Sequence, residues 1–300
     1  MLIGIIANIT KENIFEVVSS FIQKLKDNNL DYLLTNTLAE DKDKLKMLID
    51  EDFVADDEEI YAKSDLIISI GGDGTMLATA YNAYHHDKPV LGVNLGKLGF
   101  LVEADIIHMD KIIEEIKKAN YTIDERMLIT GDCEGFGDER LYAINDIVIE
   151  KGGWPKMIEL TIWIDNEYVT TFSADGLIIA TPTGSTGYSI SVGGPIVSPQ
   201  SKVITLSPIS PHSLTVRPLV IPSNQTVLIR ADSLHKDIKV SCDGQRVFTF
   251  PPPFEITIRK SDKPLRLIHT SLTTYFETLR KKLLWGVDVR FKQKENKGDK

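Results

Sequence analysis

The chain has 300 residues and a formal net charge of −9 at pH 7, with 42% hydrophobic and 26% charged residues. A chain of this length can form two domains, each with its own core. An acidic protein without a basic face is a poor candidate for binding nucleic acid, and no run approaches the roughly 18 apolar residues that span a membrane. We therefore expect no nucleic-acid partner and no membrane partner.

Two cysteines, Cys133 and Cys242, stand far apart in the chain and have no metal-binding spacing. Reduced thiols are the default for such a pair and are typical of cytoplasmic proteins. The apolar run at the N-terminus is short and has no basic residues before it, so we expect a first strand rather than a signal peptide. The prediction is a cytoplasmic protein.

The first hundred residues alternate between apolar runs and helical patterns. Residues 2–7 are a continuous apolar run, typical of a strand that is covered on both faces. Residues 11–29 place apolar side chains at helical spacing. A second buried strand is expected at 64–70, a helix at 76–86 and a further strand at 88–94. This order predicts an α/β domain with a parallel, Rossmann-like sheet.

The second half of the chain consists of short β-branched segments separated by turn residues, which is the pattern of an all-β, sandwich-like domain. Residues 105–124 indicate a helix that connects the two domains. Residues 272–290 indicate a C-terminal helix that returns to the N-terminal domain. We predict an α/β domain at 1–104 completed by 272–290, a β domain at 125–271 and a disordered charged tail at 291–300.

The sequence GGDGT begins at Gly71, directly after the second buried strand. Glycines at such a place can simply form a tight turn into a helix. The carboxyl end of a parallel strand is also where open α/β sheets bind ligands. Without side chains, Gly71, Gly72 and Gly74 would let a phosphate reach backbone N–H groups at a helix N-terminus, and Thr75 follows them. The carboxylate of Asp73 is then expected to be uncovered, next to the phosphate.

Two further stretches follow predicted strands. NLGKLGFL, at 94–101, is either a tight connection or another wall of the same site. The stretch from 175 to 199 carries six hydroxyl-bearing residues besides Tyr188 between Thr181 and Ser191. Hydroxyls with bare backbone suit ribose and phosphate recognition, although a polar hairpin would also contain them. The chain has neither a G-x-G-x-x-G at an early helix nor a P-loop, which disfavours a dehydrogenase or a P-loop enzyme.

Several motifs of the chain resemble, in the same order, those of bacterial NAD kinases: GGDGT, NLGKLGFL, AINDIVI, DGLIIATPTGSTGYSISVGGPI, PISPHSL, SCDGQ and FETLRKKLLWG. The resemblance covers nearly the whole chain. It implies an NAD site in the crevice between the two domains and transfer of the γ-phosphoryl group of ATP, with a divalent metal such as Mg²⁺, to the 2′-hydroxyl of the adenosine ribose of NAD. Some members of the family use inorganic polyphosphate. The resemblance also implies a homodimer or homotetramer, and it identifies no metal ligand.

The resemblance implies roles for individual residues as well. Asp73 would take the proton of the 2′-hydroxyl, with Gly74 beside it. Asn145 and Asp146 would hold a ribose, and Asp175 would lie near the nicotinamide amide. The other residues implied to bind NAD are Lys156, Thr186, Gly187, Tyr188, Ser189, Ser191, Ser210 and Gln245, with Tyr188 able to stack on a ring.

Three positions differ from the usual pattern of the family. Asp146 is often glutamate there, Gly187 is often alanine, and arginine is common at the position of Ala78, which leaves donor preference and pocket size open. GGDGT also occurs in lipid and sugar kinases, and a sensor that binds NAD or NADP without turnover is a further alternative. The hydroxyl-rich loop disfavours a lipid substrate, and the intact Asp73 disfavours a sensor.

Overall fold

The computed structural model describes residues 1–11, 13–40, 45, 51–96, 99–102, 104–133, 140–153 and 155–286. The contacts divide the chain into two compact units, Met1–Asp124 with Leu267–Lys300 and Glu125–Arg266. The helix that we expected to connect two domains falls in the first unit, and so does the C-terminal helix. The predicted tail at 291–300 lies outside the described residues, as do Lys97 and Leu98 of NLGKLGFL.

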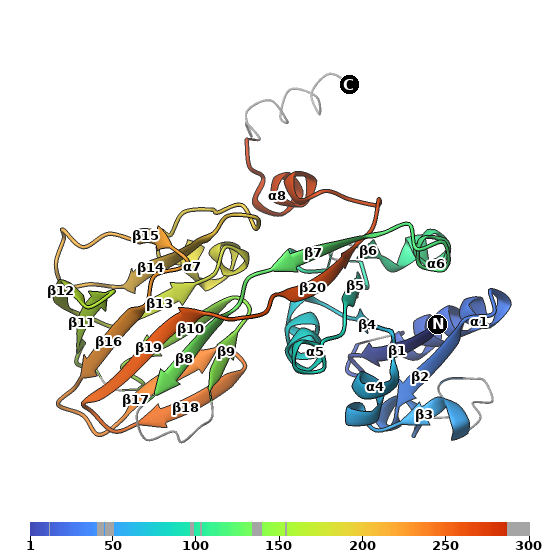
Figure 1. Cartoon of the computed structure of the whole chain (residues 1–300), viewed down its shortest axis with the longest axis horizontal. Helices are drawn as coiled ribbons and strands as arrows, with labels where there is room; N and C mark the ends of the chain where they lie inside the picture. Colours follow the sequence, from blue (N-terminus) through green and yellow to red (C-terminus); the bar gives the residue numbers. More distant parts are fainter. Residues whose placement is uncertain are drawn as a thin grey trace, which may run out of the picture. The chain divides into compact units, whose positions relative to one another are not determined.

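Within the described residues, the first unit is built around an eight-stranded sheet with the order β3-β2-β1-β4-β5-β20-β7, in which β6 pairs with β5 (Figure 1). The pairing is parallel from β3 to β20. The predicted parallel α/β class is therefore confirmed. The strands are β1 Leu2–Ala7, β2 Asp31–Thr35, β3 Val54–Ala55, β4 Leu66–Ile70, β5 Val90–Asn94, β6 Ala104–Asp105, β7 Thr122–Arg126 and β20 Leu265–His269.

Helices of this unit follow the predicted amphipathic patterns. In α1, every one of Ile14, Val18, Phe21 and Leu25 is buried, and their spacing of three or four residues places them on one helical face. The helices are α1 Ile14–Asp27, α2 Asn36–Ala39, α4 Asp57–Lys63, α5 Asp73–His85, α6 Met109–Lys117 and α8 Tyr275–Leu283, with 3₁₀ turns at Glu51–Phe53 and Ile106–His108.

Helix α5 begins at Asp73, three residues before the predicted start at 76. Gly72 has an extended backbone and serves as the N-cap, and its carbonyl accepts the first helical hydrogen bond from the N–H of Met76 at 3.0 Å. The last three residues of GGDGT are thus the first turn of the helix. This places Asp73 at the helix N-terminus rather than in a loop in front of it.

The order of the sheet puts β1 and β4 side by side, with chain connections leaving in opposite directions from this pair. Doubly wound sheets bind ligands at the carboxyl ends of such a pair. Asn8 follows β1 and Thr75 lies beyond β4, and the Asn8 Nδ2 donates to Thr75 Oγ1 at 3.3 Å. The GGDGT motif therefore stands at the position in this sheet where a ligand is expected.

The second unit contains, in the part of the chain that the structure describes, two six-stranded sheets whose pairings are antiparallel (Figure 1). One has the order β15-β14-β13-β10-β17-β18, and the other β12-β11-β16-β19-β8-β9. The strands are β8 Ile129–Cys133, β9 Leu141–Ala143, β10 Asp146–Glu150, β11 Ile158–Ile164, β12 Glu167–Ala174, β13 Gly176–Ala180, β14 Val203–Ile209, β15 Leu219–Pro222, β16 Val227–Asp232, β17 Ile238–Cys242, β18 Arg246–Phe250 and β19 Phe254–Lys260.

Alternate side chains of both sheets form one hydrophobic core. In β11, for example, Ile158, Leu160, Ile162 and Ile164 are buried while the residues between them are more exposed, which is the period of two that a half-buried strand requires. The predicted all-β, sandwich-like class is confirmed. The stretch Thr181–Ser191 is not a hairpin, since it folds into a 3₁₀ turn at Thr183–Thr186 and the short helix α7 at Tyr188–Ser191.

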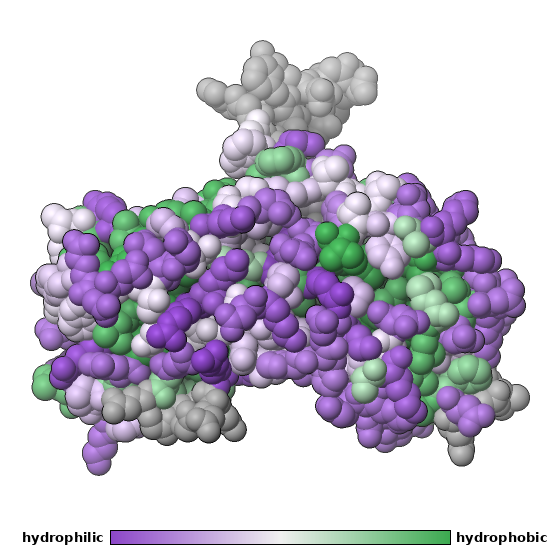
Figure 2. Space-filling model, in the orientation of Figure 1, coloured by the Kyte–Doolittle hydropathy of each residue, from purple (hydrophilic) through white to green (hydrophobic). Residues whose placement is uncertain are grey.

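Most of the face visible in Figure 2 is hydrophilic, with smaller hydrophobic patches between the polar side chains. Some large apolar side chains on the edge strands β12 and β15 are exposed, among them Tyr168, Val169, Leu219 and Val220. None of the helices in the described ranges is long and apolar enough to cross a membrane.

Candidate active site

The carboxylate of Asp73 accepts three hydrogen bonds from backbone N–H groups of the segment that follows β5. Oδ2 accepts from Phe100 at 3.0 Å, and Oδ1 accepts from Leu101 at 3.1 Å and from Val102 at 3.3 Å. The expectation that this carboxylate is uncovered is therefore wrong. Its glycine neighbours cannot cover it, but a segment 27 to 29 residues further along the chain does. The three donors hold the carboxylate in one orientation.

Two glycines allow this segment to lie so close to α5. A Cβ at Gly99 would overlap Asp73 Oδ1, and a Cβ at Gly92 would stand 3.0 Å from the carbonyl oxygen of Leu101. A side chain at Gly99 would therefore displace the Asp73 carboxylate, and one at Gly92 would be tightly packed against the segment. Gly99 lies in the motif that we considered as either a tight connection or a wall of the site, and the contact with Asp73 ties the motif to the site.

Asn94, at the end of β5, holds the start and the end of the same segment together. Its Nδ2 donates to the carbonyl oxygen of Ala104 at 3.1 Å, and its Oδ1 accepts from the N–H of Gly96 at 2.7 Å. The side chain is buried, so these bonds replace water. The segment that holds Asp73 is thus itself fixed at both ends.

The first two glycines of GGDGT lack a side chain for different reasons. A Cβ at Gly71 would lie 2.5 Å from Thr75 Oγ1, so internal packing excludes a side chain there. A Cβ at Gly72 would meet nothing within 4 Å. Gly74, in the first turn of the helix, is exposed. Open space for a phosphate is therefore found at Gly72 and not at Gly71.

In the second unit, the structure brings together Asn145, Asp146 and Gly187. A Cβ at Gly187 would stand 3.7 Å from both Asn145 Nδ2 and Asp146 Oδ2, at ordinary van der Waals distance. The backbone of Asn145 runs so close to Gly184 that a Cβ at Gly184 would overlap its carbonyl oxygen. The loop predicted to bind a dinucleotide is thus seated on the residues predicted to hold its ribose.

The Asp146 carboxyl group is buried, with 4% of the residue exposed. Burial and the nearby carboxylate of Asp243 raise its pKa to about 7, against a hydrogen bond from the backbone of Tyr188 that lowers it. A carboxyl group with this pKa changes its charge near neutral pH. Such a group is typical of a functional site, although structural pairs of carboxylates also produce this shift.

Most hydroxyl groups of the 181–191 loop bond within the protein. Thr181 Oγ1 donates to the carbonyl of Ile144 at 2.6 Å, and Ser185 Oγ donates to that of Pro182 at 2.7 Å. Ser189 Oγ bonds Ser207 Oγ at 2.9 Å in the interior. The predicted ligand residues of the loop also have internal bonds: Thr186 Oγ1 donates to the carbonyl of Thr183 and Ser191 Oγ to that of Tyr188. The abundance of hydroxyl groups therefore has a structural cause, and it is weaker evidence that the loop binds a ribose.

Tyr188 differs from these hydroxyl residues because its side chain points outward, with 44% of the residue exposed. Its backbone N–H bonds the carboxyl group of Asp146, and the predicted stacking of its ring on a ligand ring stays a prediction.

Asp175 forms an ion pair with Lys151, with 2.6 Å between Oδ1 and Nζ. The next residue, Gly176, pairs with Ile209 across β13 and β14, so Asp175 and Ser210 stand at the same end of this ladder. Ser210 has a left-handed backbone, with φ of 46°, and is exposed.

The two remaining predicted NAD residues lie on other segments of the second unit. Lys156 is exposed on the segment before β11, and Gln245 is exposed in the turn between β17 and β18.

Sequence reasoning missed two residues of the Asn145 region, Asp243 and Arg246. The carboxylate of Asp243 accepts hydrogen bonds from three consecutive backbone N–H groups, those of Ile144, Asn145 and Asp146. Arg246 Nη2 donates to Asp243 Oδ2 at 2.8 Å. The motif SCDGQ pointed to this turn, but nothing in it shows that the aspartate bonds a segment 97 to 99 residues earlier.

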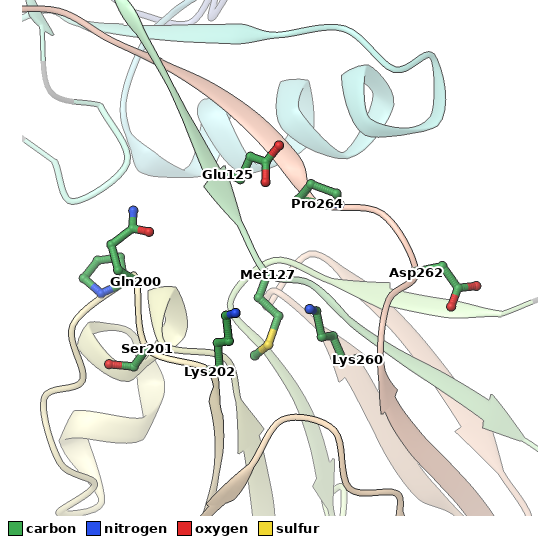
Figure 3. Close-up of a pocket in the computed structure, with 9 residues that line it drawn as sticks. Glu125, Met127, Gln200, Ser201, Lys202, Lys260, Asp262 and Pro264 are labelled. Carbon is green, nitrogen blue, oxygen red and sulfur yellow. The ribbon is translucent and has the colours of Figure 1, made fainter.

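A separate cavity of about 230 Å³ lies within the second unit. Lys202 and Lys260 stand to either side of Met127, whereas Glu125 and Asp262 lie further out (Figure 3). None of the predicted site residues lines it. Two lysines and two acidic residues line it, so its formal charges balance. It adds nothing to the candidate site.

Among the described residues, no group of three or more His, Cys, Asp or Glu side chains could hold a metal ion. The acidic side chains of the candidate site are also engaged with protein groups: Asp73 and Asp243 with backbone N–H groups, and Asp175 with Lys151. The donor set that these described residues offer does not fit a resident metal centre.

Comparisons with known proteins agree with this arrangement. The chain matches the family model for the ATP-NAD kinase N-terminal domain over residues 3–121 and that for the ATP-NAD kinase C-terminal domain over residues 144–270. It is 38% identical over 287 residues to the NAD kinase of Prosthecochloris aestuarii, which covers 95% of this chain and 98% of that protein. It is 44% identical over 224 residues to the NAD kinase of Heliobacterium modesticaldum, covering 74% of this chain and 79% of that protein.

Two solved structures are similar over nearly the whole chain. The crystal structure of yeast NADH kinase complexed with NADH has a TM-score of 0.87 and 26% identity, covering 96% of this chain and 89% of that one. The crystal structure of an NAD kinase from Archaeoglobus fulgidus in complex with ATP has a TM-score of 0.73 and 26% identity, covering 95% of this chain and 99% of that one. The family models, the full-length relatives and the shared fold together establish that the chain belongs to the ATP-NAD kinase family.

Proposed function

We propose that this chain is an NAD kinase that transfers the γ-phosphoryl group of ATP to the 2′-hydroxyl of the adenosine ribose of NAD, giving NADP. The observation that carries the proposal is the match to both kinase domains, in order, over residues 3–121 and 144–270. Relatives named NAD kinase align over 95% of the chain, and structural neighbours hold NADH or ATP.

In this reaction Asp73 is the base that takes the proton of the 2′-hydroxyl. A carboxylate has about four acceptor positions, of which the backbone donors use three. Oδ2 accepts a single one of these bonds, from Phe100, and so it is the oxygen with an acceptor position left for the hydroxyl. The N–H groups orient the carboxylate, and a well-placed base contributes roughly 10²- to 10⁴-fold in rate.

The phosphates of ATP bind at the N-terminus of α5. The open space at Gly72 lets a phosphate approach the first N–H groups of the helix, where the helix dipole favours negative charge. Gly74 and Thr75 belong to the same first turn. Gly71 supports this turn by making room for the Thr75 side chain.

NAD is held in the second unit by Asn145 and Asp146, which accept from or donate to a ribose, and by the ring of Tyr188. Gly187 leaves space beside both polar side chains, so a family member with alanine there has one methyl group more in this pocket. Asp175, Ser210, Gln245 and Lys156 are further proposed contacts to the dinucleotide.

Mg²⁺ is proposed to arrive with ATP, because magnesium is usually bound through substrate phosphates with few protein ligands. Bound in this way, it offsets the charge of the phosphates. We expect EDTA to abolish turnover and to leave the melting temperature of the ligand-free protein unchanged. A lower melting temperature in EDTA would point to a resident structural metal instead.

We further propose a homodimer or homotetramer. The apolar side chains of Tyr168, Val169, Leu219 and Val220 on two edge strands favour association, since exposed apolar edges are prone to pairing. Light scattering after size-exclusion chromatography measures the state directly, and a monomer at assay concentration would contradict this part of the proposal.

The function is tested by incubating the purified chain with ATP, MgCl₂ and NAD and following NADP with an NADP-specific dehydrogenase. Parallel reactions contain polyphosphate in place of ATP, NADH in place of NAD, and diacylglycerol or fructose 6-phosphate as acceptor. We expect NADP formation from ATP and NAD. ATP consumption with a lipid or sugar acceptor, or tight NAD binding without any product, would overturn the proposal in favour of another kinase or of a sensor.

A further inference from the structure

Three consecutive backbone N–H groups point at one carboxylate oxygen in the second unit. Asp243 Oδ1 accepts from Ile144 at 2.9 Å, from Asn145 at 2.6 Å and from Asp146 at 3.4 Å. Successive N–H groups that converge in this way form an anion-binding concavity of the kind that often receives a phosphate. Here the anion is a side chain of the protein itself.

The other oxygen of the same carboxylate is held by a cation. Arg246 Nη2 donates to Asp243 Oδ2 at 2.8 Å and also to the carbonyl oxygen of Tyr142 at 2.9 Å. The Asp243 side chain is 2% exposed and that of Arg246 is 25% exposed. Arg246 therefore neutralises a buried charge and, through Tyr142, fixes the chain just before the three N–H groups.

The carbonyl groups of the same three residues are also bonded. Ile144 accepts from Thr181 Oγ1 at 2.6 Å and Asn145 accepts from the N–H of Thr181 at 2.8 Å. Asp146 accepts from the N–H of Asp243 at 3.0 Å. Every backbone polar group of residues 144–146 thus has a partner outside the segment, and the backbone conformation is fixed from both sides.

This segment is neither helix nor regular strand before Asp146, so its shape is not set by secondary structure. Its two polar side chains, those of Asn145 and Asp146, are the ones proposed to hold the ribose. From this we infer that Asp243 is a positioning residue for the acceptor: it fixes the backbone of Ile144–Asp146 and thereby aims the side chains of Asn145 and Asp146 at NAD, with Arg246 holding its carboxylate in place. The inference rests on the proposed NAD kinase function.

Asp243 also acts on Asp146 through its charge. Its carboxylate is a cause of the raised pKa of Asp146, after burial. The other groups that interact with this pair are the backbone N–H of Tyr188 from α7, the guanidinium of Arg246 from β18 and the thiol of Cys242 from β17. Removing the charge of Asp243 therefore lowers the pKa of Asp146, and the pH dependence of NAD binding should move with it.

The test compares Asp243→Asn with wild type in the NADP-forming assay from pH 5.5 to 8.5. We expect the KM for NAD to rise at least about tenfold, because ordering a binding group by second contacts typically contributes one to two orders of magnitude. The KM for ATP should stay within about twofold. The pH at which the KM for NAD changes should move to a lower value in the variant.

Asp165→Asn is the matched control. Asp165 is also a turn aspartate with a left-handed backbone, with φ of 49°, and its Oδ1 accepts from the N–H of Thr226 at 2.8 Å, 61 residues away. It bonds none of the predicted NAD residues. We expect its variant to keep the KM for NAD and its pH profile.

An unchanged KM for NAD in Asp243→Asn, or equal rises in the KM values for NAD and ATP, would overturn the inference. If that variant does not fold, Arg246→Met retains the bonds from the three N–H groups and removes the cation together with its bond to the carbonyl oxygen of Tyr142. It should raise the KM for NAD selectively, and no selective rise would contradict the inference. Failure of the proposed function is a different result, in which the wild-type chain itself forms no NADP.

Discussion

Gly99 and Asp73 are in such close contact that a single methyl group on Gly99 would overlap Oδ1 of the carboxylate. The two residues belong to different motifs, one at the start of α5 and one after β5. The absence of a side chain at Gly99 allows Phe100, Leu101 and Val102 to donate to Asp73. The contact joins the two glycine-rich motifs of the first unit into one structure.

Gly99→Ala is expected to displace the Asp73 carboxylate and to break at least one of its three hydrogen bonds. We predict a fall in kcat of at least about tenfold, since misplacement of a catalytic group by an ångström is costly, and a loss of about 1 to 3 kcal/mol in the free energy of unfolding from overpacking. Steady-state kinetics and urea unfolding measure the two effects. Gly153→Ala, where a Cβ meets nothing within 4 Å, is the control. Wild-type kcat in Gly99→Ala would show that the position of Asp73 does not matter.

Gly72→Ala should change the KM for ATP but not the melting temperature, whereas Gly71→Ala should lower the melting temperature. A Cβ at Gly72 meets no protein atom within 4 Å, and its φ of −102° suits any residue. Gly72→Ala should therefore keep the melting temperature of the ligand-free protein and raise the KM for ATP, because the methyl group occupies the space proposed for phosphate. Gly71→Ala should lower the melting temperature, because its Cβ would crowd Thr75. Equal KM values for ATP in Gly72→Ala and wild type would place the phosphates elsewhere.

Asp146→Asn tests the buried carboxyl group through the pH dependence of stability. The pKa of Asp146 in the folded protein, about 7, is above its ordinary value of 3.8. The folded state therefore binds this proton more tightly than the unfolded state does, and the contribution of the group to stability is lost as pH rises from about 4 through 7.

Asparagine cannot ionise, so the variant should be more stable than wild type at pH 8, by on the order of 4 kcal/mol, with no such gain at pH 4. Thermal unfolding of the ligand-free proteins at several pH values checks this prediction, with Asp165→Asn as the control. NAD binding should become weaker in Asp146→Asn in spite of the higher stability. A difference in melting temperature that is the same at pH 4 and pH 8 would mean that Asp146 is not the titrating group.

The fold class could be predicted from local patterns because those patterns are caused by burial. The run at 2–7 and the spacing of Ile14, Val18 and Phe21 report which faces are covered, and β1 and α1 follow them closely. The start of α5 was placed three residues late because Gly72, Asp73 and Gly74 are poor helix formers in isolation. In the structure, the glycine N-cap and the hydrogen bonds from residues 100–102 to Asp73 allow the helix to begin at Asp73.

The details of the site depended on contacts between residues far apart in the chain. Asp73 is bonded by a segment 27 to 29 residues away, and Asp243 bonds one 97 to 99 residues away. Neither relationship has a local signature, so Asp73 was expected to be open and Asp243 was missed. The hydroxyl-rich stretch as a whole favours ribose recognition in the sequence, because a sequence does not show that hydroxyls such as those of Thr181 and Ser185 bond their own protein.

The central claim, that Asp73 is the base for phosphorylation of NAD, is tested most directly by the turnover of Asp73→Asn. The control is Asp105→Asn, whose carboxylate accepts from a backbone N–H, that of Ile107 at 3.1 Å, and has no proposed role. With ATP, MgCl₂ and NAD, we predict that wild type and Asp105→Asn form NADP at similar rates. Asp73→Asn should lose at least about 10²-fold in kcat while its Kd for NAD stays within about threefold. A kcat for Asp73→Asn within tenfold of wild type would contradict the account.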